Sequence, residues 1–446
     1  MTTIVSASEA PGLLDESPMT RAQIVVVCVA ILLAMLDGFD VLGMAFVAPA
    51  VSHAWHLNKA VLGFLLSTSL LGMAIGSIGL SPLADVTGRK PAVFGGILLM
   101  VLGSVLSAFS HNVPELALCR IVTGLGIGIM VPLTTTLGSE FASAKSRSFA
   151  VAATTVGFAA GSTIGGLVAA ALLKHATWPA VFLSGALVGA LLLPVVALGL
   201  PESPSYLISR RTTDALARLN RVLTRLGRPA LAALPDAAPA RRASYAALFT
   251  PAMVGTTLTF TTVMVLVSTA TYYLLNWLPQ MITDAGFSPS QGSLVSAMPA
   301  LVGMISGLLW GLAANRFGPG RLAAICAIGS GCTLALFGFT PPVLGMFLLV
   351  TGISGLFAGG AAGLFYATMA AVLPAPVRVS GIGFVIGVGR VFSILGPMLA
   401  GLMFAGGLTR LEVSLIFACA PIGAGLLLFG AARLTPAPAA IAAAKA

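Results

Sequence analysis

The feature that most constrains this chain is a series of continuous apolar segments, each about as long as a membrane is thick. A helix needs about 20 apolar residues to cross roughly 30 Å of hydrocarbon. The runs are continuous rather than alternating, which excludes a closed β-barrel. We therefore expect an all-α membrane protein with twelve spans, near residues 23–50, 60–82, 92–110, 115–138, 149–173, 178–200, 252–280, 290–314, 322–338, 342–372, 379–404 and 411–432.

The charge content excludes the soluble classes of protein. Only 8% of the 446 residues are charged, whereas a soluble domain carries about 25%. A cytosolic enzyme, a nucleic-acid-binding module and a secreted domain are therefore excluded, and the lipid bilayer is the expected surrounding. The five cysteines lie in apolar segments without CxxC spacing or neighbouring histidines, so we expect neither a disulfide framework nor a metal site. No cofactor is expected. We also expect a monomer.

The distribution of lysine and arginine predicts the orientation. If the N-terminus is cytoplasmic, 18 of these residues fall on the cytoplasmic side and only Lys59, Lys174 and Arg410 on the other. Positive residues gather on the cytoplasmic side of membrane proteins. Both termini are therefore predicted to be cytoplasmic. The protein is expected to lie in the cell inner membrane. The net charge of +10 then reflects topology and not a nucleic-acid partner.

The chain repeats itself about one long polar stretch, residues 201–250, where regularly spaced arginines and leucines predict amphipathic helices. Asp85 and Asn315 are 230 residues apart, and Arg147 and Arg378 are 231 apart. A nearly constant offset indicates a duplicated six-helix unit, the architecture of secondary transporters. The predicted parts are a cytoplasmic tail (1–22), a six-helix half (23–200), a cytoplasmic linker (201–250), a second six-helix half (251–433) and a tail (434–446).

Two loop sequences and the end of the first half carry a family resemblance. Ser81 to Lys90 follows the pattern Gly/Ser-x-x-x-Asp-x-x-Gly-Arg-Lys, residues 311–318 hold a degenerate copy, and residues 201–204 read Pro-Glu-Ser-Pro. The chain thereby resembles the major facilitator superfamily along nearly its whole length. The resemblance implies a transporter and not an enzyme, with twelve helices in two pseudo-symmetric halves. Val86 and Asn315 depart from the usual residues of these loops.

Within that superfamily the chain is similar to the aromatic acid:proton symporters. The narrower likeness rests on Asp37-Gly38-Phe39-Asp40 in span one, on Arg120 with the glycines that follow it, on residues 273–279 and on Gly389-Arg390 ahead of Gly396-Pro397. It implies uptake of aromatic carboxylates coupled to protons, with both Asp37 and Asp40 required.

Charged residues inside the predicted spans are functional candidates because charge at membrane depth costs several kcal/mol. At about 1.5 Å per residue, Asp37 and Arg390 come from opposite halves and lie near the midplane. We predict that Arg390 binds the substrate carboxylate, because a guanidinium holds a carboxylate with two parallel hydrogen bonds. A structural ion pair is the alternative. Asp40 and Arg120 form a second predicted pair, higher in the membrane and within one half.

The remaining charged candidates concern coupling and gating. Position favours Asp37 for carrying the proton, the expected coupling ion, and Asp40 for pairing with Arg120. Glu140, at the inner end of span four, is predicted to form an intracellular gate with Arg147 or Arg378, or else to cap a helix. The loop charges Asp85 and Arg89 are assigned to a charge lock between the halves.

Aromatic and amide side chains are the candidates for holding an aromatic ring, through offset stacking, edge contacts and hydrogen bonds. We assign Phe39, Tyr272, Asn276, Trp310 and Tyr366 to substrate binding. An interfacial belt or simple helix packing is the alternative explanation for such residues.

The leading functional hypothesis is symport of a small aromatic carboxylate, such as benzoate or a hydroxybenzoate, with protons. A carrier of another organic anion or of a sugar is the nearest alternative, since the Pro-Glu-Ser-Pro segment is shared with sugar carriers. A drug:proton antiporter is disfavoured because residues 161–166 lack the proline that such proteins carry in span five. A sensor on the same fold is disfavoured because residues 201–250 are too short for a signalling domain.

Overall fold

The computed structural model describes residues 4–5, 18–210, 214–235, 245–374 and 377–432. The predicted tail 434–446, most of the tail 1–22 and parts of the linker 201–250 lie outside the described residues. So do five of the basic residues used to predict the orientation, namely Arg211, Arg241, Arg242, Arg433 and Lys445.

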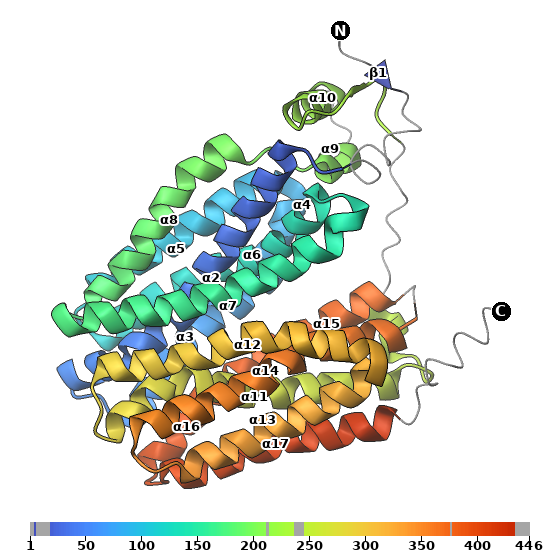
Figure 1. The fold of residues 1–446 in the computed structure, drawn as a ribbon. Coiled ribbons are helices and arrows are strands. Elements are labelled where there is room, and N and C mark those ends of the chain that lie inside the picture. Colours follow the sequence, from blue (N-terminus) through green and yellow to red (C-terminus); the bar gives the residue numbers. More distant parts are fainter. Residues whose placement is uncertain (1–3, 6–17, 211–213, 236–244, 375–376, 433–446) are drawn as a thin grey trace. The chain divides into compact units, whose positions relative to one another are not determined.

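The described residues contain twelve helical segments long and apolar enough to cross a membrane, which confirms the all-α, twelve-span prediction (Figure 1). Ten of the spans are single helices: α2 (Arg21–Ala54), α5 (Arg89–Ala108), α6 (Val113–Phe141), α7 (Ala144–His175), α8 (Pro179–Gly199), α11 (Val254–Asp284), α12 (Pro289–Phe317), α13 (Pro319–Phe339), α14 (Leu344–Val372) and α17 (Arg410–Ala432).

Two spans are interrupted, and a proline explains each break. The second span runs through α3 (Lys59–Ile75), a π-helical turn (Gly76–Leu80), a 3₁₀ turn (Ser81–Leu83) and α4 (Ala84–Thr87). The eleventh consists of α15 (Arg378–Ser393) and α16 (Leu395–Ala405). Pro82 and Pro397 have no backbone N–H to donate to Ile78 and Ser393, four positions earlier, so one helical hydrogen bond is missing at each break.

The polar linker contains short elements. Helices α9 (Pro204–Arg210) and α10 (Ala215–Arg225) precede a two-residue strand β2 (Ala230–Leu231), which pairs in parallel with β1 (Ile4–Val5); a 3₁₀ turn covers Tyr245–Phe249. Helix α10 is amphipathic: Leu219 and Leu223 are buried, whereas Arg218 and Arg221 are exposed. The 3.6-residue helical repeat places leucine and arginine on opposite faces.

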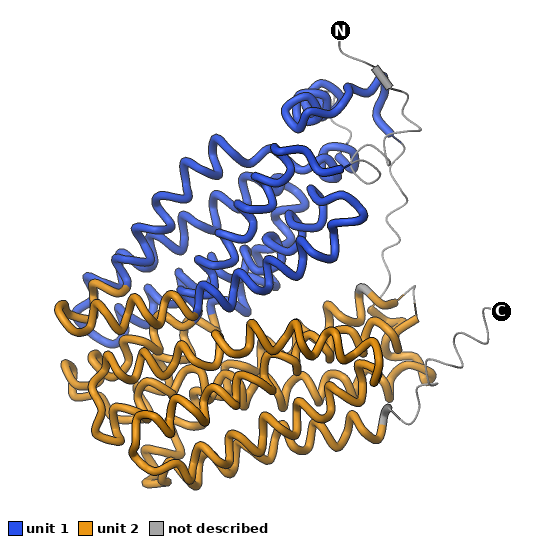
Figure 2. Tube along the Cα trace, in the orientation of Figure 1, with its two compact units in different colours: residues 1–41, 72–162, 182–241 blue, residues 42–71, 163–181, 242–446 orange. Residues whose placement is uncertain are grey.

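The helices form two compact units (Figure 2). Unit 1 comprises residues 1–41, 72–162 and 182–241, and α5 packs along α6 inside it. Unit 2 comprises residues 42–71, 163–181 and 242–446. In unit 2, α13 packs against α14 and α17, and α12 packs against α14. The core of unit 2 includes Phe260, Leu364 and Phe365.

Unit 2 joins helix ends that the predicted topology assigns to the extracellular side. Lys59 of α3 forms an ion pair with Asp284 of α11, and the Ser67 hydroxyl donates to the carbonyl oxygen of Ile394 at 3.0 Å. Near this contact a Cβ added at Gly63 would lie 2.8 Å from the Gly401 Cα. Small residues allow such close approach of helix backbones in membranes, so these ends of spans two, seven and eleven are closed on one another.

Candidate functional site

Unit 2 encloses a cavity of about 210 Å³ between α11, α13, α14, α15 and α17. Three of the six residues that the sequence assigned to substrate binding line it, namely Arg390, Tyr272 and Tyr366. The charge of Arg390 interacts electrostatically with both phenols. The structure therefore brings the predicted anion anchor and two aromatic hydroxyl groups into one cavity, although they come from three different helices.

Local sequence fixes the place of Arg390. It lies on the last turn of α15, just before the break at Ile394, and the Ser393 hydroxyl donates to its carbonyl oxygen at 2.6 Å. Its neighbour Gly389 faces α11, where an added Cβ would collide with Met264. The missing side chain lets α15 approach α11 closely, and Arg390 consequently lines the cavity together with residues of α11.

The other three predicted substrate residues do not line this cavity. The Asn276 amide is buried and donates to the carbonyl oxygen of Tyr272 at 2.9 Å. The Trp310 indole donates to the carbonyl oxygen of Leu356 at 2.8 Å. The ring of Phe39 lies against Gly185 of α8, where a Cβ would come within 2.5 Å of it. These contacts give the three side chains packing roles, and their part in substrate binding stays a prediction.

The predicted coupling residues lie buried in unit 1. Asp37 and Asp40, both on α2, are 1% and 2% exposed, and Arg120 of α6 is fully buried. Arg120 Nη2 donates to the main-chain carbonyl oxygen of Asp40 at 2.8 Å. The Asp40 carboxyl accepts a hydrogen bond from Ser104 at 3.3 Å, and the Arg120 guanidinium lies over the Phe182 ring, 5.1 Å from its centroid. The predicted proximity of Asp40 and Arg120 is thus present, through the backbone of α2.

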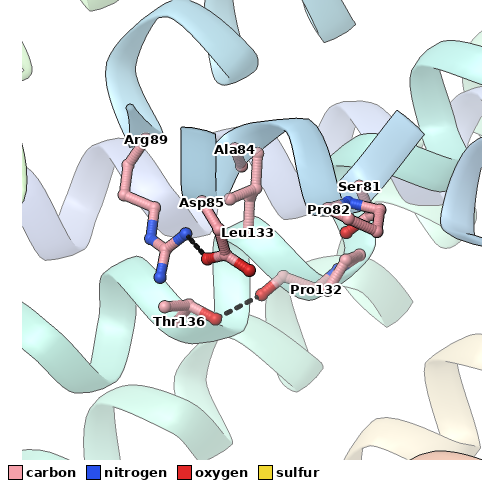
Figure 3. A pocket seen from close by; sticks show the side chains of 8 residues that line it. All are labelled: Ser81, Pro82, Ala84, Asp85, Arg89, Pro132, Leu133 and Thr136. Atoms are coloured by element: carbon pink, nitrogen blue, oxygen red, sulfur yellow. Dashed lines mark hydrogen bonds and ion pairs between the residues drawn. The ribbon is translucent and has the colours of Figure 1, made fainter. Parts of the chain in front are cut away.

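A charge cluster forms where α4, α5 and α6 meet in unit 1. Arg89 pairs with Asp85 four residues earlier (Figure 3) and lies 3.7 Å from Glu140 of α6. Glu140 in turn accepts a hydrogen bond from the Ser203 hydroxyl at 2.6 Å. Beside the cluster, a cavity of about 230 Å³ is lined by Asp85, Arg89 and Thr136, among others. The gating candidates Asp85, Arg89 and Glu140 therefore share one network.

Glu202 completes this cluster, although no role was predicted for it from the sequence. Its Oε1 accepts hydrogen bonds from the backbone N–H groups of Arg89 at 2.7 Å and Lys90 at 3.3 Å. A carboxylate at a helix N-terminus meets unpaired donors and the positive end of the helix dipole. The Pro-Glu-Ser-Pro segment was the available signal, but the contact joins residues 113 positions apart.

The other two gating candidates contact nearby carbonyl groups. Arg147 Nε donates to the carbonyl oxygen of Ser139 at 3.2 Å, and Arg378 Nε donates to that of Leu373 at 3.2 Å. Both contacts stabilise the start of a helix after a short connection. The predicted pairing of Glu140 with Arg147 or Arg378 stays a prediction.

The described residues contain no group of three or more histidine, cysteine, aspartate or glutamate side chains arranged to hold a metal ion. What the cavity in unit 2 offers is a cation, hydroxyl groups and an apolar wall. Such a combination can bind an organic anion through charge-assisted hydrogen bonds and hold its hydrocarbon part by burial.

Known transporters are similar to this chain in sequence and in fold. The family model of the Major Facilitator Superfamily matches residues 28–306 and 258–445. The chain is 31% identical to the 4-hydroxybenzoate transporter PcaK of Pseudomonas putida, over 86% of each chain. It is 29% identical to the gallate transporter of the same organism, over 89% of this chain and 88% of the relative. The crystal structure of a D-xylose-proton symporter matches 91% of this chain and 97% of its own, with a TM-score of 0.73 and 17% identity, which supports the fold alone.

Proposed function

Because the chain belongs to the major facilitator superfamily, we propose that it takes up small aromatic carboxylates, such as benzoate or hydroxybenzoates, together with protons by alternating access. It is a multi-pass membrane transporter and not an enzyme. Relatives named for the transport of 4-hydroxybenzoate and gallate support the aromatic substrate class.

The observation that carries the proposal is the position of Arg390 in an otherwise largely apolar cavity with Tyr272 and Tyr366. A guanidinium binds a carboxylate with two parallel hydrogen bonds and does not lose its charge. The volume of about 210 Å³ is below the roughly 300–1,000 Å³ typical of drug-sized ligands. The site therefore suits one ring with one carboxylate.

Protons are required on energetic grounds. Moving one negative charge inward against the membrane potential costs about 2.3 kcal/mol per 100 mV. One proton moved with each carboxylate removes this cost, and a further proton would drive accumulation. Asp37 and Asp40 are the proposed carriers because they are buried acids in the membrane-spanning part of α2. The proposed coupling ion is the proton, and no cofactor is needed for this cycle.

We further propose that the protein lies in the inner membrane with both termini cytoplasmic. The argument is the predicted 18 to 3 distribution of lysine and arginine between the two faces, since translocation disfavours positively charged loops. Reporter fusions at residue 58 and at the C-terminus test it. Only the reporter at residue 58 should be accessible from outside the cell.

The test of the transport proposal is uptake of labelled benzoate and 4-hydroxybenzoate into liposomes that contain the purified protein, under an imposed pH gradient. Arg390→Lys keeps the charge but loses the planar pair of donors, so the KM should rise about tenfold. Arg316→Lys is the matched control, because Arg316 is exposed and does not line the cavity. Accumulation without a proton gradient, or wild-type affinity in Arg390→Lys, would contradict the proposal.

A further inference from the structure

The cavity that holds Arg390 has a polar end and an apolar end. The polar end is formed by Arg390 of α15 and by three side chains from one stretch of α11, namely Ser268, Thr271 and Tyr272. The apolar end is formed by Val263, Ala323, Ala327, Ala361 and Leu428. None of the described residues lining the apolar end carries a polar side-chain group.

The burial of the lining residues supports this division. Val263, Ala327 and Leu428 are 1%, 2% and 3% exposed, whereas Arg390 and Thr271 are only partly buried. The apolar end is therefore the closed end of the cavity, and the polar end is the more accessible one.

Helix α14 shows the same arrangement in cross-section. Ala361 and Phe365 are one turn apart and buried, while Ala362 and Tyr366 are also one turn apart and exposed. Residues four apart lie on one face of a helix, so the first pair lines the closed end and the second pair lines the opening. Tyr366 belongs to the polar end because its phenol interacts with the charge of Arg390.

Resting on the proposed function, we infer that the cavity selects aromatic acids by the group on the ring opposite the carboxylate. With its carboxylate at Arg390, a benzoate directs the opposite ring edge into the apolar end. A hydroxyl group there would lose its hydrogen bonds to water without gaining a partner, which is unfavourable. A hydrogen atom or a methyl group carries no such penalty. A hydroxyl group next to the carboxylate lies instead among Ser268, Thr271 and Tyr272.

The test compares uptake of benzoate, 4-methylbenzoate, 2-hydroxybenzoate and 4-hydroxybenzoate into liposomes that contain the full-length protein. An apolar pocket rejects an added hydroxyl group by about 10- to 100-fold. We expect the KM for 4-hydroxybenzoate to exceed that for benzoate at least about tenfold, while 4-methylbenzoate, of similar size, stays close to benzoate. The 2-hydroxy acid should also stay close to benzoate.

The decisive variant places a hydroxyl group at the apolar end. Val263→Thr keeps the shape of the side chain and should reduce the discrimination against 4-hydroxybenzoate several-fold. Val350→Thr, on α14 and outside the cavity, is the matched control and should leave it unchanged. Ala327→Ser is a second variant at the apolar end, in case Val263→Thr does not yield folded protein.

The outcomes separate this inference from the proposed function. If the wild type takes up 4-hydroxybenzoate with the same KM as benzoate or a lower one, the inference is overturned and the proposed function stands. If the discrimination is present but neither Val263→Thr nor Ala327→Ser reduces it, the placement of the ring is wrong. If none of the four acids is transported by the wild type, the proposed function itself fails.

Discussion

Arg120 Nη2 donates a hydrogen bond to the main-chain carbonyl oxygen of Asp40 at 2.8 Å. The donor lies on α6 and the acceptor on α2, and both residues are buried. An arginine that binds the backbone fixes a segment of helix and not only a side chain. Arg120 thus positions the turn of α2 that carries Asp37, Phe39 and Asp40.

We predict that Arg120→Met destabilises the protein more than it changes substrate affinity. Removing one partner from a buried charged pair costs about 3–5 kcal/mol, because the other charge is left without compensation. The double variant Arg120→Met/Asp40→Asn should therefore be more stable than Arg120→Met alone. Thermal unfolding of the purified proteins in detergent measures the stability of the single and the double variant. A double variant less stable than either single variant would contradict the pairing.

Asp37→Asn and Asp40→Asn should behave differently. Asp40 is held by Ser104 and by the nearby charge of Arg120, so we predict that its replacement lowers stability as well as accumulation. Asp37→Asn removes a buried carboxyl on the same helix; it should abolish accumulation driven by a pH gradient and preserve exchange of labelled for unlabelled substrate. Counterflow and gradient-driven uptake in the same liposomes distinguish the two activities. Normal accumulation in Asp37→Asn would show that another residue carries the coupled proton.

Gly88→Ala should destabilise the charge cluster of unit 1. Gly88 has a φ of 110°, a conformation that costs a residue with a Cβ of order 1–3 kcal/mol, and the added Cβ would meet the Glu202 carboxylate. Gly95→Ala on α5 is the matched control, since a Cβ there meets nothing within 4 Å. The control should be neutral or stabilising because alanine favours helix. Equal melting temperatures for the two variants would show that the Gly88 conformation is unimportant.

Gly63→Val should open the helix ends that unit 2 holds together. Its side chain would collide with α16 at Pro397 and Gly401, so uptake should fall severalfold. Cysteine introduced at the buried position Ser67 should then react faster with a membrane-impermeant thiol reagent added outside. Gly423→Val is the control, because a Cβ at Gly423 meets nothing within 4 Å. Unchanged labelling and uptake in Gly63→Val would argue that these ends need not close.

The candidate site was only partly predictable from sequence. Arg390, Tyr272 and Tyr366 were singled out for chemistry and depth, and they share a cavity. Phe39 and Trp310 were singled out by the same reasoning but contact neighbouring helices, and Asn276 donates to a carbonyl oxygen of its own helix. The difference is the face of the helix that each residue occupies. A transmembrane helix that is apolar all round has no polar stripe to reveal which face is inward.

The sequence by itself determined the number of spans, the helical class and the family, because the thickness of a bilayer and the need to pair every backbone group leave a long apolar segment no other structure. Asp85 and Arg89 were singled out as a charge lock between the halves, but the ion pair that they form with each other, four residues apart on the chain, was not predicted. Only the tertiary structure decided that Glu202 caps α5, that Arg120 holds the backbone of α2, and that small residues of α13 and α14 form one end of the Arg390 cavity. Those contacts join residues from separate helices, and their geometry depends on helix rotation and packing, which composition and hydropathy do not specify.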